Sequence, residues 1–197
     1  MSISQSPNAA RLDRRHMFRI AGVTTLSAAA ISVLGGCKSM AASTASASEN
    51  DVQILNVALG LEHEAIGAYQ LGAQSGLLQK PVLDVAVLFQ SHHKQHRDAL
   101  MGAIKQLGGM PVAAKSLDEY AKELNAASLK NQSDVLMLAQ KLEKGAANAY
   151  LGVIPSFESK DLAQVSGRLA ADETMHWTVL TTALKQSLPE KALTLGA

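Results

Sequence analysis

Two short motifs in this chain carry side chains that bind metal ions in proteins. His93 and His96 lie three residues apart in the first half, and Glu173 and His176 repeat that spacing in the second half. Residues three apart share one face of a helix. Imidazole and carboxylate groups are ligands that zinc, iron and manganese accept. The matched spacing therefore predicts a metal site to which both halves of the chain contribute.

The two motifs belong to a longer internal repeat. The segment LEHEAIGAY at 61–69 returns as LEKGAANAY at 142–150. Each copy places one glutamate, Glu62 or Glu143, on a helix face that is otherwise mostly Leu, Ala, Ile and Tyr, which is the face that turns inward. A bare carboxylate on such a face is costly, and metal coordination removes that cost. The repeat therefore adds these two glutamates to the predicted site.

Helices are the elements expected to position these residues, because Ala, Leu, Gln, Lys and Glu dominate and β-branched runs are absent. Asn50 and Ser133 are expected N-caps, and the capping-box pattern of Ser116 and Glu119 predicts a short helix near 117–124. Short links join the first two and the last two long helices, so each pair is an antiparallel hairpin. The result is an all-α, antiparallel four-helix bundle of two repeated hairpins with a long crossover. The four long helices are predicted at 51–78, 81–107, 133–154 and 160–184.

The predicted hairpins also set the height of each candidate ligand. Residues equally distant from the turn of an antiparallel hairpin lie at the same level along it. This rule brings the candidates of each hairpin to its middle: Glu62 with His93 and His96, and Glu143 with Glu173 and His176.

On these positions the chain resembles the ferritin-like domain proteins of the ferritin/rubrerythrin superfamily, most of all their exported bacterial branches. The resemblance spans about residues 51–184. It implies two bound metal ions, iron in the first place and manganese or zinc as alternatives, held by one Glu from each of two helices and a Glu-x-x-His from each of the other two. The matching positions are Glu62, His93, His96, Glu143, Glu173 and His176.

One position departs from the family pattern, because His93 stands where the family has glutamate. The site then offers three carboxylates and three imidazoles, so two divalent ions would keep a formal charge of +1. We expect such a site to favour reduced metal or to hold one ion weakly. It would also prefer zinc or copper to manganese.

Four further residues are expected around the ligands. Asp172 precedes Glu173 in an arrangement that resembles di-iron enzymes in which the aspartate braces a histidine ligand. His92 is its counterpart in the first half. Tyr69 and Tyr150 follow the two glutamates of the repeat by two helical turns. We interpret them as hydrogen-bonded core tyrosines, with a redox role as the alternative.

The N-terminus carries the features of an export signal. Arg14 and Arg15 precede a weakly apolar stretch, which is a twin-arginine pattern, and Leu34-Gly35-Gly36-Cys37 resembles a lipobox with lipidation at Cys37. The protein is therefore expected to be exported, periplasmic and membrane-anchored, with the outer membrane favoured because Lys rather than Asp follows the cysteine. The predicted organisation is a signal peptide at 1–37, a flexible Ala/Ser-rich tether at 38–49, the bundle at 50–188 and a C-terminal tail at 189–197.

These features give three hypotheses for the function. The first is an enzyme-like di-metal protein that handles oxygen, peroxide or ferrous iron in stress defence. The second is a metal-binding or carrier module without catalysis, and the third is a metal-free structural envelope protein. The membrane is the expected partner, and a homodimer is a further alternative. A net charge of +1 and no basic block interleaved with aromatics exclude a nucleic-acid partner.

Overall fold

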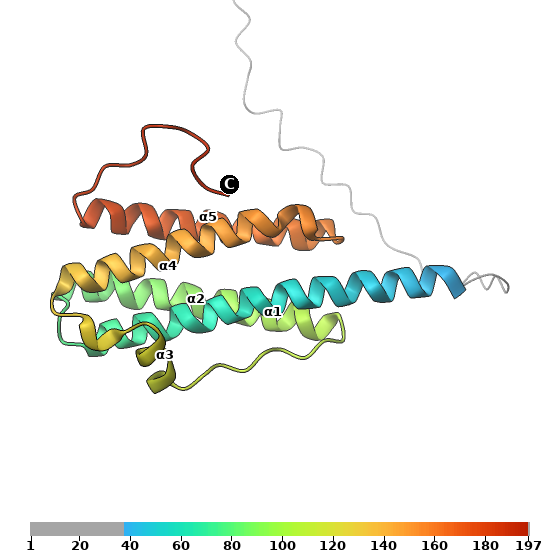
Figure 1. Cartoon of the computed structure of the whole chain (residues 1–197), viewed down its shortest axis with the longest axis horizontal. Helices are drawn as coiled ribbons and strands as arrows, with labels where there is room; N and C mark the ends of the chain where they lie inside the picture. The colour runs from blue at the N-terminus through green and yellow to red at the C-terminus, as the bar shows by residue number, and fades with distance from the viewer. Residues whose placement is uncertain (1–37, 197) are drawn as a thin grey trace, which may run out of the picture. The chain divides into compact units, whose positions relative to one another are not determined.

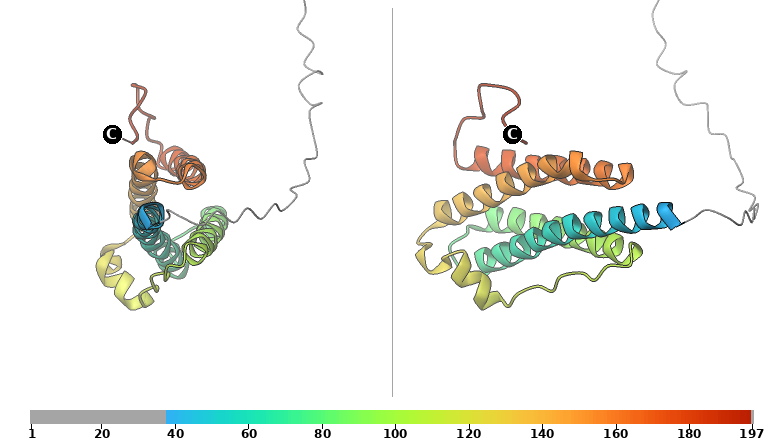
Figure 2. Two further views of the ribbon diagram at one scale, coloured as in Figure 1. Left: turned by 90° about the vertical axis from the view of Figure 1, so that its right-hand side faces the viewer. Right: turned by 45° about the vertical axis from the view of Figure 1, so that its right-hand side comes forward.

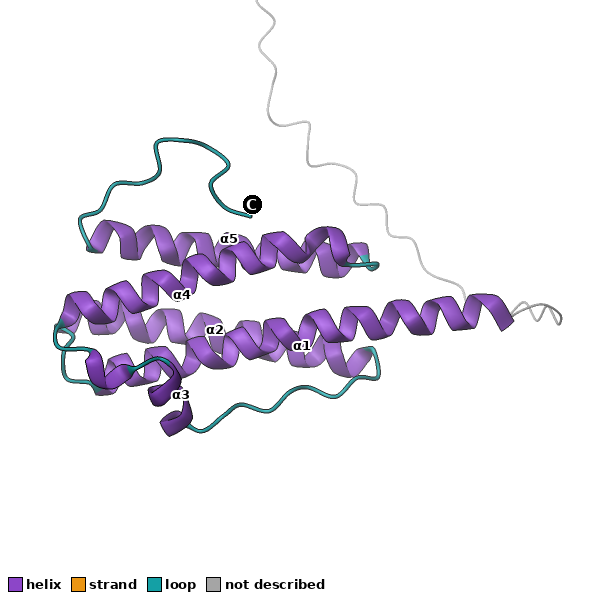
Figure 3. Cartoon of the chain, in the orientation of Figure 1, coloured by secondary structure: helices purple, strands orange, loops and turns teal. Residues whose placement is uncertain are grey.

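The computed structural model describes residues 38–196, and side chains from residue 49. Its four long helices form two antiparallel hairpins, α1–α2 and α4–α5, which lie side by side (Figures 1 and 2). No strand occurs in residues 38–196 (Figure 3). The predicted all-α four-helix bundle is confirmed. The helices are α1 at Lys38–Gln74, α2 at Lys80–Gln106, α3 at Leu117–Glu123, α4 at Gln132–Val153 and α5 at Lys160–Ala183, with 3-10 turns at Ala126–Ser128 and Ile154–Ser156.

Local chemistry explains most helix ends. Pro81 stands in the first turn of α2, where its missing N–H costs no hydrogen bond. Gly108 follows α2 with a φ of 76°, a conformation that favours glycine. The side chain of Asn131 accepts from the backbone N–H of Asp134 and so caps α4. The predicted cap at Ser133 is therefore wrong by two residues, because asparagine offers its oxygen just before the helix starts.

The start of α1 differs more from the prediction, because the helix begins at Lys38 and not near Asp51. Residues 38–49, predicted as a flexible tether, belong to the same helix. Asn50 is therefore not an N-cap. Its side-chain amide donates to the carbonyl of Ser156 at 3.1 Å, which ties α1 to the α4–α5 turn. The predicted signal peptide and lipidation at Cys37 lie outside the described residues.

The crossover between the hairpins is held against α1. The predicted capping box of Ser116 and Glu119 is present at the start of α3. The buried ring of Tyr120 packs over Gly67, where a Cβ atom would lie only 2.7 Å from the ring. Asn56 of α1 also exchanges hydrogen bonds with the crossover backbone at 3.1 and 2.7 Å. The long link is thus a packed part of the fold.

Two apolar clusters fill the bundle on either side of its middle. They leave a polar layer between them, screened from water at both ends of the bundle. One cluster contains Leu55, Ala58, Leu59, Leu100, Ile104, Tyr150, Leu169 and Ala170, and the other contains Tyr69, Ala86, Phe89, Leu136 and Leu180. Within residues 38–196, no helix combines the length and the hydropathy that a membrane span requires.

Candidate metal centre

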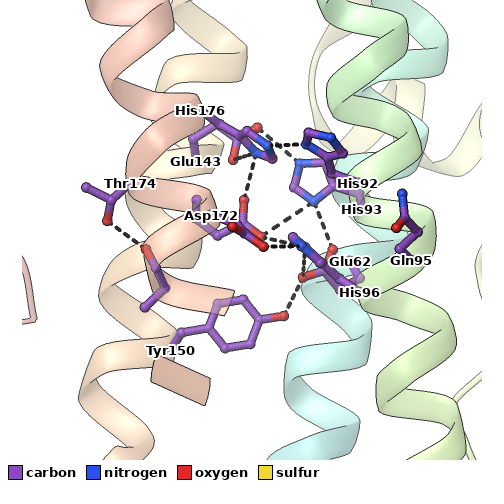
Figure 4. Close-up of polar contacts among 12 residues, drawn as sticks. Glu62, His92, His93, Gln95, His96, Glu143, Tyr150, Asp172, Thr174 and His176 are labelled. Atoms are coloured by element: carbon purple, nitrogen blue, oxygen red, sulfur yellow. Dashed lines mark hydrogen bonds and ion pairs between the residues drawn. The ribbon is translucent and has the colours of Figure 1, made fainter. Parts of the chain in front are cut away.

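The polar layer consists of the six predicted ligand residues, which come together in the middle of the bundle. Figure 4 labels all of them except Glu173. All are buried, with at most 7% of any residue exposed. Each of the four long helices contributes, because the repeat places its glutamate and its paired motif at the same level of each hairpin. The contributors are Glu62 of α1, His93 and His96 of α2, Glu143 of α4, and Glu173 and His176 of α5.

The six residues form two overlapping groups of four, and within each group the ligand atoms lie within 4.8 Å of one another. His93 and Glu173 belong to both groups. The arrangement therefore offers two adjacent metal positions with two shared residues. The first group is Glu62, His93, His96 and Glu173, and the second is His93, Glu143, Glu173 and His176.

Glu173 can serve both positions because its two oxygens face opposite sides of the centre. Its Oε1 lies 3.1 Å from Nδ1 of His96, and its Oε2 lies 3.2 Å from Nδ1 of His176. Burial, the largest influence on this carboxyl group, raises its pKa above the usual value. A bound cation would offset that cost.

His93 lies between the glutamates of the two repeats. Its Nδ1 is 2.8 Å from Oε2 of Glu62, and its Nε2 is 3.1 Å from Oε1 of Glu143. Burial disfavours the imidazolium, but hydrogen bonds to Glu143 and Glu62 outweigh it and raise the pKa of His93 to about 11. A neutral imidazole has only one acceptor nitrogen. His93 can therefore bind one of the two ions, whereas a glutamate in its place could bind both.

Two buried side-chain atoms, Nδ1 of His96 and Oε1 of Glu173, have no hydrogen-bond partner of good geometry in the described part of the chain. They lie 3.1 Å apart in the same group of four. Since nearly all buried polar atoms in proteins are hydrogen-bonded, this pair needs an explanation. A cation between them would satisfy both atoms, so the residues present fit a metal ion.

The outer nitrogens of the two other histidines contact residues from the opposite hairpin. His96 Nε2 lies 3.2 Å from Oδ2 of Asp172, and His176 Nε2 lies 2.9 Å from Nδ1 of His92 (Figure 4). Each contact turns Nδ1 of the ligand histidine toward the centre. The two residues that make these contacts differ chemically. Asp172 is acidic, whereas burial and the neighbouring His176 lower the pKa of His92 and favour its neutral form.

The two tyrosines of the repeat cross between the hairpins. Tyr69 donates its hydroxyl hydrogen to Oε1 of Glu143, and Tyr150 donates to Oε1 of Glu62. Burial and the adjacent carboxylates raise the pKa of both phenols well above the usual value, so both stay protonated donors. The structure thus places them as hydrogen-bonded core residues. Their partners across the repeat were not predicted from the sequence.

A further neighbour of the centre was missed by the sequence analysis. The ring of Phe89 stacks on that of His176, with centroids 4.0 Å apart. Phe89 lies one helical turn before His93 and shares its face, which is the signal that could have identified it.

Protons balance the carboxylates when no metal is bound. Burial opposes charge on His96, but Glu173 and Glu62 raise its pKa to about 10. Burial also opposes charge on the two repeat glutamates, yet their histidine partners lower the pKa of both Glu62 and Glu143. Metal binding requires neutral imidazole, so it must displace these protons.

Comparisons with known proteins concern the family and the fold of the bundle. Residues 50–186 match the family model described as a ferritin-like domain. The crystal structure of a conserved hypothetical protein, rv2844, from Mycobacterium tuberculosis is similar, with a TM-score of 0.63 and 20% identity over 75% of this chain and 99% of that chain. At that identity the likeness concerns the fold alone. No curated protein matches.

Proposed function

Because the chain belongs to the ferritin-like domain family, we propose that it is an exported protein that binds two metal ions, with iron the first candidate. Its role is to handle oxygen, peroxide or ferrous iron in stress defence. The observation that carries the proposal is the pair of overlapping His/Glu groups that share His93 and Glu173. Family membership supports the predicted ferritin-like topology as well.

The residues divide between the two positions. Glu62 and His96 belong to one position alone, and Glu143 and His176 to the other, while Glu173 turns one oxygen to each. Bound iron would supply electrons to oxygen or peroxide.

The surrounding residues orient the carboxylates and exclude water. Each tyrosine hydroxyl donates to Oε1 of a glutamate, and Oε2 of each glutamate contacts a histidine of the centre. The raised pKa of Tyr69 and Tyr150 keeps those protons on the phenols. The apolar clusters above and below prevent bulk water from entering along the bundle axis.

Two openings on the sides of the bundle provide access. Between α1 and α4, a hollow of about 270 Å³ reaches His93 and Glu143 past the small residues Gly145 and Ala146. Between α2 and α5, a groove of about 540 Å³ reaches His96. Small reactants such as oxygen, peroxide or a metal ion therefore have routes to the centre.

The proposed location depends on the N-terminal sequence. The twin-arginine pattern at Arg14 and Arg15 suits a protein that folds and takes up its metal before export, and Cys37 would anchor it in the membrane. A metal-loaded bundle gives a reason for that route.

Metal content is the test of this proposal. The protein would be exported through its own signal, purified without chelators or a His tag, and analysed by elemental mass spectrometry beside a Glu64→Gln control. Glu64 lies on α1 outside both groups of four. Two iron or manganese ions per chain would support the proposal, and oxygen and peroxide kinetics would then separate an oxidase from a carrier. One zinc or copper ion would mean that His93 has changed the site.

A metal-free structural bundle is the second candidate, and one observation favours it. Each of the three glutamates already lies within 3.3 Å of a histidine nitrogen, so the layer is largely paired without a metal. Absence of metal after export and after anaerobic reconstitution would support this candidate and exclude the first.

A further inference from the structure

A cavity lies apart from the metal centre, at the end of the bundle that holds the α1–α2 turn. It has a volume of about 150 Å³, and we call it the turn-end cavity. Its rim includes Pro81, Val179 and Ala183, all exposed, and its floor includes the buried rings of Tyr69 and Phe89. The cavity therefore leads from solvent into the apolar cluster at this end.

The walls of the turn-end cavity select for an apolar occupant. Its lining consists of hydrocarbon side chains and Gly72, apart from the phenol of Tyr69. That hydroxyl is already used, because it donates to Glu143. A polar molecule would lose its hydrogen bonds to water and gain none from these side chains.

The internal repeat shows that this cavity is a specific feature of one end. Repeat-related positions line a hollow of only about 10 Å³ at the other end, beside Tyr150. There Val153 and Leu162 occupy the places of Gly72 and Val82, and Phe157 closes the turn. The bundle is therefore hollow at the α1–α2 turn and filled at the other end, because Gly72 and Val82 are smaller than the residues at the matching positions.

We propose that the turn-end cavity binds a small apolar organic molecule, about the size of one aromatic ring. An engineered apolar cavity of about 150 Å³ in another protein binds benzene, so the volume is sufficient. The occupant would lie against Phe89, which stacks on His176, and against Tyr69, which holds Glu143. This inference goes beyond the proposed function and does not depend on whether a metal is bound.

Fluorobenzene is a suitable probe. Its binding to the purified protein would be measured by ¹⁹F NMR titration, in chelator-treated and in metal-loaded samples. Ala139→Leu fills the cavity, and Ala171→Leu adds the same side chain to an exposed position of α5 as a matched control. We expect saturable binding to the wild type and to Ala171→Leu. Ala139→Leu should weaken binding by about tenfold or more, since a filled pocket no longer holds the ring.

Val82→Leu is a second, milder variant that copies Leu162 at the hollow of the other end, and it should also weaken binding. Three results would overturn the proposal: no saturable binding to the wild type, equal binding to Ala139→Leu, or equal binding of 4-fluorobenzoate. Binding in the chelator-treated sample is independent of the metal, so failure of the metal proposal would leave this result intact.

Discussion

At the scale of the residue, His93 is one of two residues that the two groups of four share. It stands at a shared position and touches glutamates of both repeats, but a neutral imidazole offers one lone pair to a metal. The other shared residue, Glu173, offers an oxygen to each side. The two shared residues are therefore chemically unequal, although they occupy matching positions of the internal repeat.

The first prediction is that His93→Glu strengthens the weaker of two metal positions. The change provides a fourth carboxylate and balances the charge of two divalent ions. We expect the affinity for the second ion to rise by roughly tenfold or more, since a bridging carboxylate can bind both ions. Chelator competition on anaerobically reconstituted protein would measure this. His63→Glu, on α1 and outside both groups, is the control, and a lower metal count in His93→Glu would contradict the idea.

The second prediction concerns protons. With pKa values of about 11 and about 10, His93 and His96 carry protons at pH 7 in the metal-free protein. Metal binding should release about two protons per chain, and metal affinity should rise as the pH rises from 6 toward 9. Calorimetric titration in two buffers of different ionisation enthalpy measures the release. Affinity that is independent of pH would show that these histidines are not ligands.

The same shifts set the pH dependence of the metal-free fold. A pKa raised in the folded state means that the imidazolium of His93 stabilises the protein. This contribution is complete below the unfolded-state pKa of about 6.5 and is lost progressively as the pH rises to about 11.

At the scale of the element, the two hairpins are joined through the tyrosines. Tyr69 and Glu143 link α1 to α4, and Tyr150 and Glu62 make the reciprocal link. Each hydroxyl is a buried donor to a buried carboxylate, so its loss leaves a charged oxygen with one partner fewer.

The third prediction follows from these links. Tyr69→Phe and Tyr150→Phe should each lower the free energy of unfolding of the metal-free protein by about 1–3 kcal/mol. Urea titration followed by circular dichroism would measure the loss. Tyr120→Phe is the control, because in the described part of the chain the hydroxyl of Tyr120 accepts one hydrogen bond, from the backbone N–H of Lys115 within the crossover. A smaller loss in both variants than in the control would argue against the links.

The fourth prediction concerns how α3 docks on α1. Gly67→Ala would place a methyl group 2.7 Å from the ring of Tyr120, so α3 must shift, at a cost of about 1–3 kcal/mol. Gly60→Ala on the same helix has open space around the new methyl group and should stabilise the protein by about 0.5–1 kcal/mol. Thermal unfolding of both variants makes the comparison. Equal stability of the two would mean that the contact with Tyr120 is unimportant.

The elements also show how far the sequence could predict this structure. Helical period and hairpin level bring Glu62, His93 and Glu173 to one layer, because both quantities depend on spacing along the chain. The tyrosine links could not be predicted, since they depend on how one hairpin is rotated against the other. The turn-end cavity was missed as well, because it arises from small side chains such as Gly72 on several helices at once.

At the scale of the whole molecule, the chain is a duplicated hairpin whose halves have diverged in specific places. The ligand layer is preserved except at His93, where the second half has Glu173. The residues that contact the outer nitrogens of the ligand histidines also differ, being His92 in the first half and Asp172 in the second. The end of the bundle at the α1–α2 turn has a cavity of about 150 Å³, whereas the hollow at the other end is only about 10 Å³. Each difference changes the side-chain chemistry of one hairpin, while both hairpins keep the same backbone architecture.

The fifth prediction tests whether metal binding stabilises the whole fold. A metal that binds only the folded chain adds about 4 kcal/mol to the free energy of unfolding at 1,000 times its dissociation constant. Glu173→Gln should abolish most of this gain, because Glu173 serves both positions. The metal-free variant should be as stable as the wild type or more stable, since burial raises the pKa of Glu173 and so disfavours its charge. Thermal unfolding with and without metal, beside Glu64→Gln as control, separates the alternatives. A metal-dependent gain that survives in Glu173→Gln would place the ions elsewhere, and a wild type with no gain would favour the metal-free bundle.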